Sequence, residues 1–357
     1  MRSKRRMPTK TVRSIEMRYS IGYQLPDELD STPDICRDYA EHVSNVYFSW
    51  GADPSGRSPL FVMQEDAEAV HAQQLCDLRE IRDMGISLTL LLNANCYGEK
   101  ALSKELRDRS LSKISFLREQ VGLSRVTTTS PFLASCIREA FGSEIRVTAS
   151  VNMRVGTIPT MRQLCRSFDG FYLAKELNRD LDAVGKISVW CRENGKTLHL
   201  LANSGCLAYC GFQTFHDNLV AHEAALTEQD NVASGYPAPC WEYLHSLPEM
   251  DALTTVLQAN WIRPEDVSLY EPYVPELKLA TRMHSRPRMV IAAYVRGRYR
   301  GSALDLTEPS YAPLFRGAIL DNTLFPSDFG AVTSRCTHRC DACGYCRSVA
   351  EKAFVRL

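Results

Sequence analysis

The chain has 357 residues, a length that suits one large single-core domain or two ordinary ones. Its composition, with 45% hydrophobic and 24% charged residues, excludes collagen-like, low-complexity and largely disordered proteins. Because 42 basic residues balance 42 acidic ones, no overall charge draws the chain to nucleic acid or to an anionic membrane. A small-molecule or peptide substrate is therefore favoured over RNA, although a local basic patch stays allowed.

The first ten residues are basic, as at the start of a signal peptide, but no apolar segment follows them. Arg13, Glu16 and Arg18 interrupt the next stretch. The longest apolar runs are also far shorter than the roughly 20 residues that cross a bilayer. We therefore expect a cytoplasmic protein without membrane contact, in which residues 1–11 form a flexible basic tail.

Short β-branched or apolar segments alternate with helix-patterned segments from residue 12 onward. Strands are predicted at residues 12–18, 43–49, 86–93, 125–129, 145–151, 170–175, 197–203 and 274–280. Helices are predicted at residues 66–84, 103–121, 131–141, 180–194 and 216–229. The first two of these helices stop at Gly85 and Gly122, which are good helix terminators.

This alternation predicts parallel βαβ units, because a parallel neighbour strand needs a crossover connection and a helix supplies it. Eight units over about 280 residues suit an α/β fold of the (β/α)8 TIM-like barrel type. An open doubly wound sheet is the alternative, but no Gly-x-Gly-x-x-Gly follows a predicted strand. We assign residues 12–285 to the barrel, with a metal site at its mouth, the open end formed by the C-terminal ends of the strands. Residues 286–357 are assigned to a C-terminal extension with a second, cysteine-rich metal site. The residues of both sites are given below.

In a TIM barrel the functional residues lie at the C-terminal ends of the strands. Polar residues follow nearly every predicted strand, so we expect a ring of amides, carboxylates and cations around one mouth. Each is more often an ordinary loop residue when taken singly, so the argument depends on their coincidence. From this ring we take one catalytic candidate, Glu176, and five substrate-binding candidates, Glu16, Asn93, Asn203, Lys278 and Arg282.

Three cysteines are expected at this mouth. Cys206 and Cys210 come directly after the seventh strand, and Cys240 follows a helix that carries His216. Thiolates are soft ligands, so three of them together favour zinc or an iron–sulfur cluster over magnesium or calcium. Cys96 or His216 could complete the ligand set, or an iron would keep an open position. His216 is our second catalytic candidate, and three buried thiols without a metal are the plain alternative.

A second cysteine group gives the strongest metal signal of the chain. Cys336, Cys340, Cys343 and Cys346 lie within 11 residues, with gaps of three, two and two residues, so all four can face one ion or cluster. Zinc would make this a structural site, and iron–sulfur a redox or structural one. The first three also have the radical S-adenosylmethionine spacing, but that motif lies early in a barrel, whereas only 11 residues follow Cys346.

Several motifs carry a family resemblance through their order and spacing. They are the segment from Asn203 to Cys210 with the following His216 and His222, residues 262–270, the segment from Lys278 to Arg282, and the terminal cysteine run. Over about residues 12–350 the chain resembles the U32 peptidase-like family. Despite the peptidase name, similar proteins are TIM-barrel iron–sulfur proteins. Several are associated with oxygen-independent hydroxylation of RNA or of the ubiquinone ring, with prephenate implied as the hydroxyl donor.

Carried over by position, the resemblance implies a [4Fe–4S] cluster at the mouth, held by Cys206, Cys210 and Cys240. It also implies that Arg57 after the second strand binds a carboxylate of the donor. Lys278 and Arg282 are suited to the same task, since both carry cationic hydrogen-bond donors. A partner chain from the same family is a further option that the resemblance leaves open.

Three functions remain after this reading. The first is an iron–sulfur oxidoreductase that hydroxylates a small-molecule or peptide acceptor without dioxygen. The second is a non-enzymatic iron–sulfur module for electron transfer or binding, and the third is a peptidase. No serine elbow, Walker lysine or His-Glu-x-x-His motif is present, so common hydrolase and kinase chemistries have no signature here.

Overall fold

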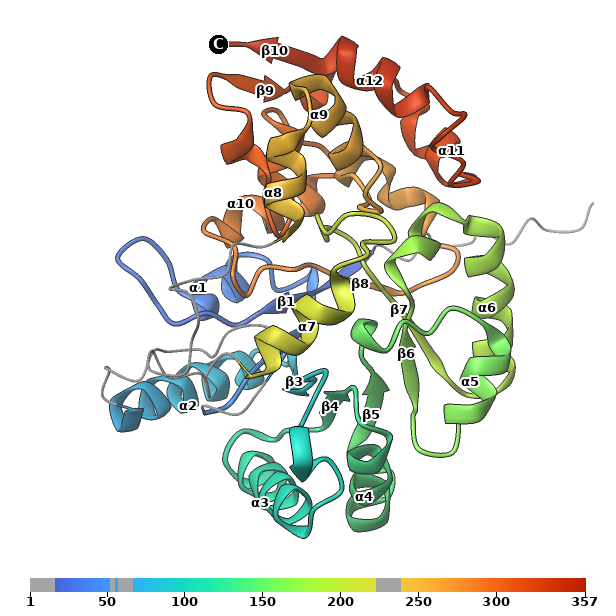
Figure 1. Cartoon of the computed structure of the whole chain (residues 1–357). Coiled ribbons are helices and arrows are strands. Elements are labelled where there is room, and N and C mark those ends of the chain that lie inside the picture. Colours follow the sequence, from blue (N-terminus) through green and yellow to red (C-terminus); the bar gives the residue numbers. More distant parts are fainter. Residues whose placement is uncertain (1–16, 52–54, 57–66, 223–238) are drawn as a thin grey trace, which may run out of the picture.

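The structure is a computed structural model that describes residues 17–51, 55–56, 67–222 and 239–357. Eight parallel strands close into a barrel in the order β1 to β8, with β8 paired to β1 (Figure 1). The predicted (β/α)8 TIM-like barrel is confirmed. Its strands are β1 Arg18–Gly22, β2 Val43–Phe48, β3 Ser87–Leu92, β4 Arg125–Thr128, β5 Arg146–Ala149, β6 Gly170–Tyr172, β7 Thr197–Leu201 and β8 Glu276–Lys278.

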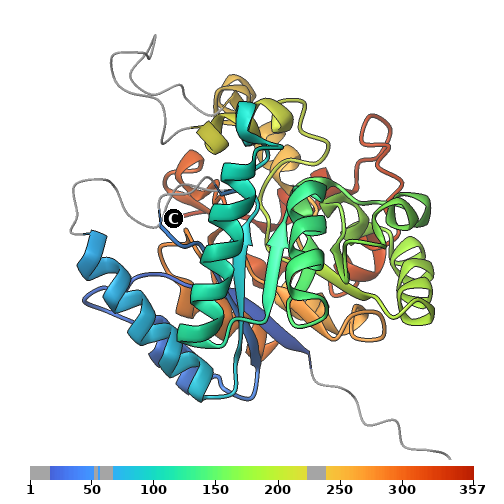
Figure 2. The ribbon, with the colours of Figure 1, turned by 90° about the horizontal axis from the view of Figure 1, so that it is seen from below.

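Helices cover the outside of the barrel, and Figure 2 shows three of them, α2, α3 and α4, around the strands. The α-helices are α1 Thr32–Asp38, α2 Ala67–Asp83, α3 Lys104–Val121, α4 Pro131–Phe141, α5 Ile158–Leu164, α6 Leu181–Glu193, α7 Gln213–His222, α8 Pro239–Ser246, α9 Glu249–Leu257, α10 Pro287–Arg296, α11 Phe329–Thr333 and α12 Tyr345–Ala353. None of these described helices is both long and apolar enough to span a bilayer.

Short 3-10 helices and one further strand pair complete the chain. The 3-10 helices are η1 Gly98–Lys100, η2 Val151–Met153, η3 Lys175–Arg179, η5 Pro264–Leu269, η6 Ala303–Leu306, η7 Ala312–Leu314 and η8 Asn322–Leu324. Strands β9 (Ala318–Leu320) and β10 (Phe354–Arg356) pair antiparallel outside the barrel.

Local sequence signals explain where the helices begin and end. The Ser103 hydroxyl accepts a hydrogen bond from the Leu106 amide, and the Ser130 hydroxyl accepts one from the Leu133 amide, so both serines are N-caps. Helix α3 ends at Gly122, whose φ of 68° is a left-handed conformation that favours glycine. These signals place the crossover helices close to the ranges predicted from the sequence.

The first strand lies later in the chain than predicted. Residues 12–18 were expected to form it, whereas β1 spans Arg18–Gly22. The reason lies in packing, since Tyr19 and Ile21 bury their side chains in the hydrophobic core. Arg18 therefore stands at the start of a strand, where its guanidinium donates to the Val43 carbonyl, and not at the mouth. The tail expected at residues 1–11 lies outside the described residues.

The chain builds two hydrophobic cores. The first fills and surrounds the barrel and includes Val290 and Tyr294 of α10. The second joins Leu253 and Val256 of α9 to Val349 and Ala350 of α12, beyond one end of the barrel (Figure 1). This second core therefore combines segments that precede and follow β8 in the sequence.

Asp266 is a buried acid at the junction of η5 and α11. Its side chain is 9% exposed, and a Cβ on Gly330 would lie 2.4 Å from the Asp266 carboxyl carbon. Burial raises the pKa of Asp266 to about 6, although the charges of Arg263 and Arg179 act in the opposite direction. The folded protein therefore binds this proton more tightly than the unfolded chain does.

We expect Asp266→Asn to stabilise the protein at neutral pH. The pKa of Asp266 in the folded protein, about 6, exceeds the ordinary value of 3.8. The contribution of Asp266 to folding stability is therefore most favourable below pH 4 and is lost as the pH rises to 6. The shift corresponds to a gain of about 1–3 kcal/mol for the variant at pH 7.5. Urea denaturation at pH 4.5 and 7.5 measures this, and a gain that does not grow with pH would contradict the assignment.

Candidate functional site

A small cavity with both polar and apolar walls lies at the C-terminal end of the barrel. Its volume is about 80 Å³, and its walls include Asn93, Asn152, Lys278, Arg282 and Glu308. Asn93 directly follows β3, Asn152 lies in η2 after β5, and Lys278 ends β8. The closed barrel thus gathers polar side chains from distant parts of the sequence at one mouth, as its topology requires.

Two buried cations form one wall of this cavity. The Lys278 Nζ atom lies 3.8 Å from the Tyr47 ring centroid and 5.1 Å from that of Tyr172, in cation–π contact. An Arg282 Nη2 atom donates to the Ser55 hydroxyl at 3.2 Å. Two cations beside a small cavity favour a carboxylate or another compact anion.

The amides of the mouth have different surroundings. Asn93 Oδ1 accepts a hydrogen bond from the Gly56 amide at 3.2 Å, and both Asn93 and Asn152 line the cavity. Asn203 is fully buried, and its Nδ2 atom donates to the carbonyls of Ala280 and Leu306. Asn203 therefore holds three mouth segments together, and direct substrate contact by its side chain stays a prediction.

The three mouth thiols lie near one another. Cys206 and Cys210 flank the turn after β7, and Cys240 lies at the start of α8. Burial raises the pKa of the Cys210 thiol, and the charges of Cys240 and Cys206 add to this effect, whereas Lys175 opposes it. The fold thus places Cys210 within the electrostatic reach of Cys240, which belongs to a separate segment.

Tyr311 adds a buried phenol to this thiol group. Its ring is 1% exposed and lies 5.6 Å from that of Trp241. Burial raises the pKa of Tyr311, and the charges of the three mouth thiols together with a hydrogen bond to Cys240 raise it further. Sequence reasoning missed this residue, because nothing local marks a tyrosine 71 positions after Cys240 as its neighbour.

The thiols at the barrel mouth are chemically suited to bind a soft metal ion or cluster. Three partly buried thiols suit zinc or iron–sulfur. Within the part of the chain that the structure describes, however, no three His, Cys, Asp or Glu side chains already lie close enough together to hold a metal ion.

The two catalytic candidates lie at different places around the mouth. The Glu176 carboxylate in η3 accepts a hydrogen bond from the Tyr209 amide at 3.4 Å, so it lies against the loop between Cys206 and Cys210. His216 is half-buried in α7, and the next residue, Asp217, pairs with Arg154 at 3.4 Å. Glu176 thus borders the thiols, while His216 belongs to the helix that follows them.

The C-terminal cysteines form a second group beside the first. Cys336 and Cys346 are half-buried, and Cys340 and Cys343 are exposed. Burial raises the pKa of Cys340, and the charges of Cys336, Cys346 and Cys343 raise it further. The charges of all three other cysteines thus reach Cys340, while their joint metal binding stays a prediction.

Two predicted site residues, Glu16 and Arg57, lie outside the described residues. The remaining candidates are described: Asn93, Lys278 and Arg282 share the cavity, and Cys206, Cys210 and Cys240 share the thiol group. Ser204 forms a parallel backbone β-bridge with Glu308, and Glu308 lines the cavity. The loop that leads to Cys206 therefore also borders the predicted substrate site.

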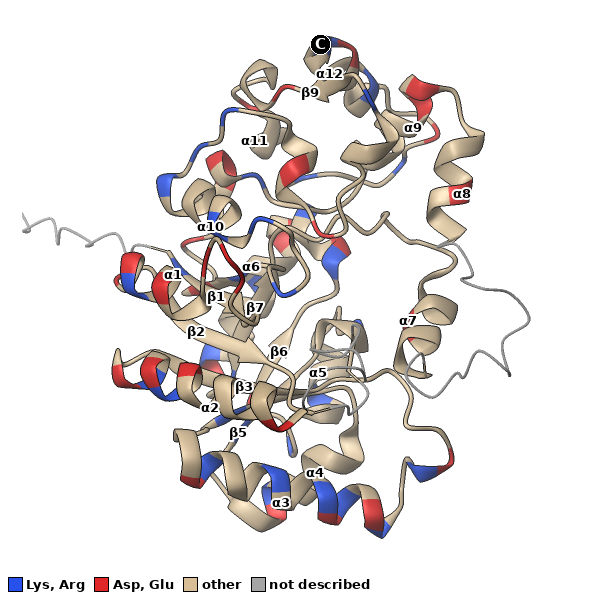
Figure 3. Ribbon diagram, turned by 90° about the vertical axis from the view of Figure 1, so that its left-hand side faces the viewer, with Lys and Arg blue, Asp and Glu red and all other residues tan. Residues whose placement is uncertain are grey.

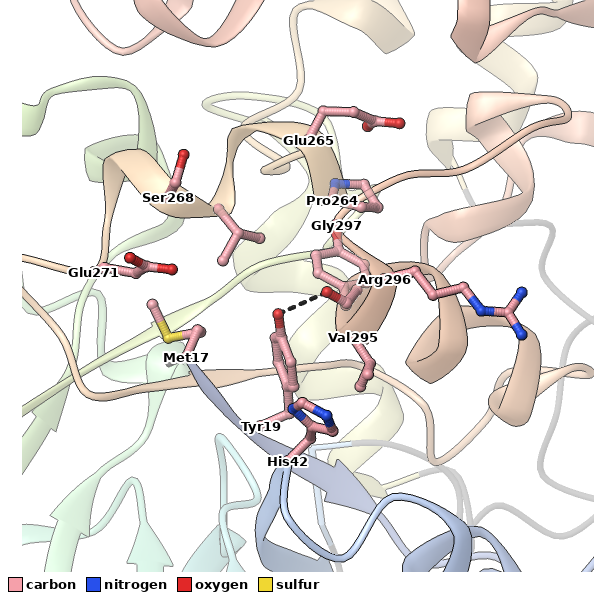
Figure 4. A pocket seen from close by; sticks show the side chains of 12 residues that line it. Met17, Tyr19, His42, Pro264, Glu265, Ser268, Glu271, Val295, Arg296 and Gly297 are labelled. Carbon is pink, nitrogen blue, oxygen red and sulfur yellow. Dashed lines mark hydrogen bonds between the residues drawn. The ribbon is translucent and has the colours of Figure 1, made fainter. Parts of the chain in front are cut away.

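A larger cavity of about 300 Å³ lies at the opposite end of the barrel (Figure 4). Met17, Tyr19 and His42 line it near the starts of β1 and β2, and the Tyr19 hydroxyl donates to the Tyr294 carbonyl at 2.8 Å. Because chemistry in TIM barrels takes place at the C-terminal strand ends, this cavity is not our candidate active site.

Comparison with known proteins agrees with the resemblance found in the sequence. No protein-family model matches the chain. The uncharacterized protease MJ1657 of Methanocaldococcus jannaschii is 24% identical over 284 residues, which cover 75% of this chain and 77% of that protein. The solved structure of the U32 peptidase Mk0906 matches with a TM-score of 0.51 at 17% identity, over 77% of this chain and 96% of that one. The structural match shows a shared fold.

Proposed function

From the premise that this chain resembles the U32 peptidase-like family in sequence and in fold, we propose that it is an iron–sulfur oxidoreductase. In this proposal Cys206, Cys210 and Cys240 hold the cluster at the barrel mouth. The reaction is hydroxylation of a small-molecule or peptide acceptor without dioxygen, with a carboxylate-bearing donor of the prephenate type.

One observation carries this proposal: the loop that leads to Cys206 is hydrogen-bonded to a residue that lines a cavity walled by two cations. Glu308 lines that cavity, and its carbonyl accepts a hydrogen bond from the Gly205 amide at 3.0 Å, directly before Cys206. The thiol loop and the anion site are thus parts of one mouth. Soft ligands next to a carboxylate site suit a redox cluster that acts on a carboxylate-bearing substrate.

A cluster held by three protein thiolates keeps one iron available to a substrate oxygen, as a Lewis acid or redox partner. The side chains of this chain would orient the reactants around it. Lys278 and Arg282 would bind the donor carboxylates, and the Asn93 and Asn152 amides would direct the acceptor. Glu176 and His216 are the proposed proton-transfer groups. The small cavity would keep bulk water away from the donor.

The charge distribution supports a compact acceptor over structured RNA. Figure 3 shows Lys and Arg interspersed with Asp and Glu on α2 and α3. RNA binding generally needs a continuous basic face to neutralise phosphates. A cavity of about 80 Å³ also accommodates only a small group.

Peptide hydrolysis is the second candidate, and the names of the related proteins support it. One relative is described as a protease and one structural neighbour as a peptidase. In this case a thiolate or a metal-bound water would attack the peptide carbonyl. Peptide cleavage that persists after loss of the mouth iron would favour this candidate over hydroxylation.

The test begins with oxygen-free purification of the full chain and analysis of iron and acid-labile sulfide. We expect Cys206→Ser combined with Cys240→Ser to remove the mouth iron, because two of its three thiolates are lost. Adding prephenate should change the paramagnetic resonance spectrum of the reduced wild-type protein. The change should be absent in Lys278→Met combined with Arg282→Met, which removes both cations.

Cys165→Ser is the matched control, since Cys165 is half-buried at the end of α5, outside both cysteine groups. This variant should keep the full iron content and the full response to prephenate. Wild-type protein that carries only zinc, or a double cysteine variant with unchanged iron, would contradict the proposed function.

A further inference from the structure

The two cysteine groups lie next to each other across an aromatic contact. Tyr209, from the loop between Cys206 and Cys210, packs edge-on against the ring of His338, with 5.2 Å between ring centroids. His338 stands between the first two cysteines of the C-terminal run, and its amide donates to Cys336 Sγ at 3.4 Å. The loop of the mouth cysteines and the C-terminal cysteine run are thus in direct contact.

The 3-10 helix η3 fixes this second group from the barrel side. The backbone carbonyl of Arg179 accepts a hydrogen bond from the Cys336 amide at 3.0 Å. The side-chain Nη1 atom of Arg179 lies 3.9 Å from Cys346 Sγ. The first and last cysteines of the run therefore both contact one barrel residue. Cys346 Sγ also lies 3.9 Å from the Leu257 carbonyl at the end of α9.

Arg179 is a buried cation that faces sulfur. Its side chain is 3% exposed, and among the described residues its Nε atom has no hydrogen-bond partner. Buried charges in proteins are normally paired or placed beside a metal centre, because desolvation without compensation is costly. The Arg179 Nη2 atom donates to the Leu257 carbonyl at 2.7 Å, and its Nη1 atom faces Cys346 Sγ.

The spacing of the four cysteines distinguishes between metals. Zinc sites generally use two ligand pairs separated by a longer segment, whereas bacterial ferredoxins place cysteine ligands in one short run with gaps of two, two and three residues, in which the first three bind one cluster and the fourth binds another in two-cluster proteins. The present run has gaps of three, two and two residues, the same set in reverse order. A single short run therefore favours an iron–sulfur cluster.

We propose that Cys336, Cys340, Cys343 and Cys346 hold a second iron–sulfur cluster, with Arg179 as its buried counter-charge. This site is separate from the mouth centre of the proposed function and does not depend on it. Three of its four thiols precede the first turn of α12, in a stretch of turns that ends at Tyr345. Because these thiols are not gathered at ligand distance, cluster binding is expected to draw them toward one point.

The experiment compares iron, sulfide and zinc contents of oxygen-free protein after reconstitution with ferrous iron and sulfide. Cys340→Ser combined with Cys343→Ser should lose one complete cluster, together with its paramagnetic resonance signal. Both side chains are exposed, so this variant leaves the hydrophobic cores intact. Cys76→Ser, at another exposed cysteine on α2, is the control and should keep all iron.

Thermal unfolding gives an independent readout. Iron and sulfide should raise the unfolding temperature of the wild type, because a cluster that binds only the folded state stabilises it. They should raise it less in Cys340→Ser with Cys343→Ser. Equal iron contents in this variant and the wild type, or zinc bound at these four thiols, would overturn the proposal.

The same series separates this inference from the proposed function. If the proposed function fails, Cys206→Ser with Cys240→Ser keeps all iron while the Cys340 and Cys343 variant loses it. If only the second cluster is wrong, the losses are reversed. Wild-type protein with two distinct clusters, each removed by its own pair of substitutions, supports both.

Discussion

Gly205→Ala is expected to destabilise the protein and to deplete the mouth of iron. A Cβ at position 205 would lie 2.1 Å from the Pro309 carbonyl oxygen and 3.1 Å from the Thr307 side chain. The nearest atom belongs to the backbone, so a side-chain rotation cannot relieve the clash. Overpacking of this kind costs about 3 kcal/mol, at the upper end of its usual range.

The same clash displaces the residue next to the first mouth cysteine. The loop at position 205 must move away from residues 307–309, to which it is joined by the Gly205–Glu308 hydrogen bond. Cys206 moves with it, so iron should fall at the mouth and stay unchanged at the C-terminal cysteines. Urea denaturation and metal analysis measure the two effects.

Gly211→Ala is the matched control for this prediction. Gly211 follows Cys210 in the same loop, and a Cβ there would meet no atom within 4 Å. Stability and iron content should therefore stay close to those of the wild type. Equal behaviour of the two alanine variants would show that the close approach at Gly205 does not position Cys206.

Glu276→Gln is expected to lower the free energy of unfolding by about 3 kcal/mol near neutral pH, as for other broken buried ion pairs. Glu276 is 8% exposed at the start of β8 and faces the barrel interior. Its carboxylate accepts a hydrogen bond from the Ser44 hydroxyl and lies 3.6 Å from His199 Nδ1 and 3.9 Å from an Arg125 guanidinium nitrogen. Glutamine keeps the shape but removes the charge.

The pH dependence of this effect has a definite sign. Burial acts to raise the pKa of Glu276, but His199, Ser44 and Arg125 outweigh it, so the pKa is lowered from its ordinary value of 4.5. The carboxylate therefore stabilises the fold above pH 4.5, and this contribution is lost as the pH falls through the lower folded pKa. The deficit of the glutamine variant should be largest at neutral pH and shrink in acid.

Glu41→Gln provides the reference, because Glu41 is an exposed carboxylate just before β2. Its unfolding free energy should match that of the wild type at every pH. Denaturation curves at pH 3.5, 5 and 7 compare the three proteins. A deficit for Glu276→Gln that grows in acid would show that the interior charge does not stabilise the barrel.

Seven of the eight barrel strands could be predicted from the sequence, because buried parallel strands read as short apolar runs. The first strand could not, since Ser20 and Gly22 are weak strand formers and its position follows from pairing with β2 and β8. Pairing across the barrel closure is a long-range effect that no local pattern records. The packing of α10 into the barrel core is a tertiary effect of the same kind.

Site residues could be predicted where reactive side chains are grouped along the sequence. Grouped cysteines and the cations at the end of the eighth strand could be found by residue type and spacing. Tyr311 and the contact between Tyr209 and His338 could not, because each joins segments that only the folded chain brings together. Asn203 was recognised as a polar residue after the seventh strand. Its hydrogen bonds to the carbonyls of Ala280 and Leu306 could not be predicted, because they depend on where the fold places those two residues.

The second hydrophobic core has a consequence for synthesis of the chain on the ribosome. Helix α9 emerges before β8, yet α12, which packs against it, is made after both. The barrel also cannot close until β8 reaches β1, so both events wait for segments made after residue 275. Until then Leu253 and Val256 of α9 lack the cover of Val349 and Ala350, so this helix exposes part of its apolar face in the nascent chain.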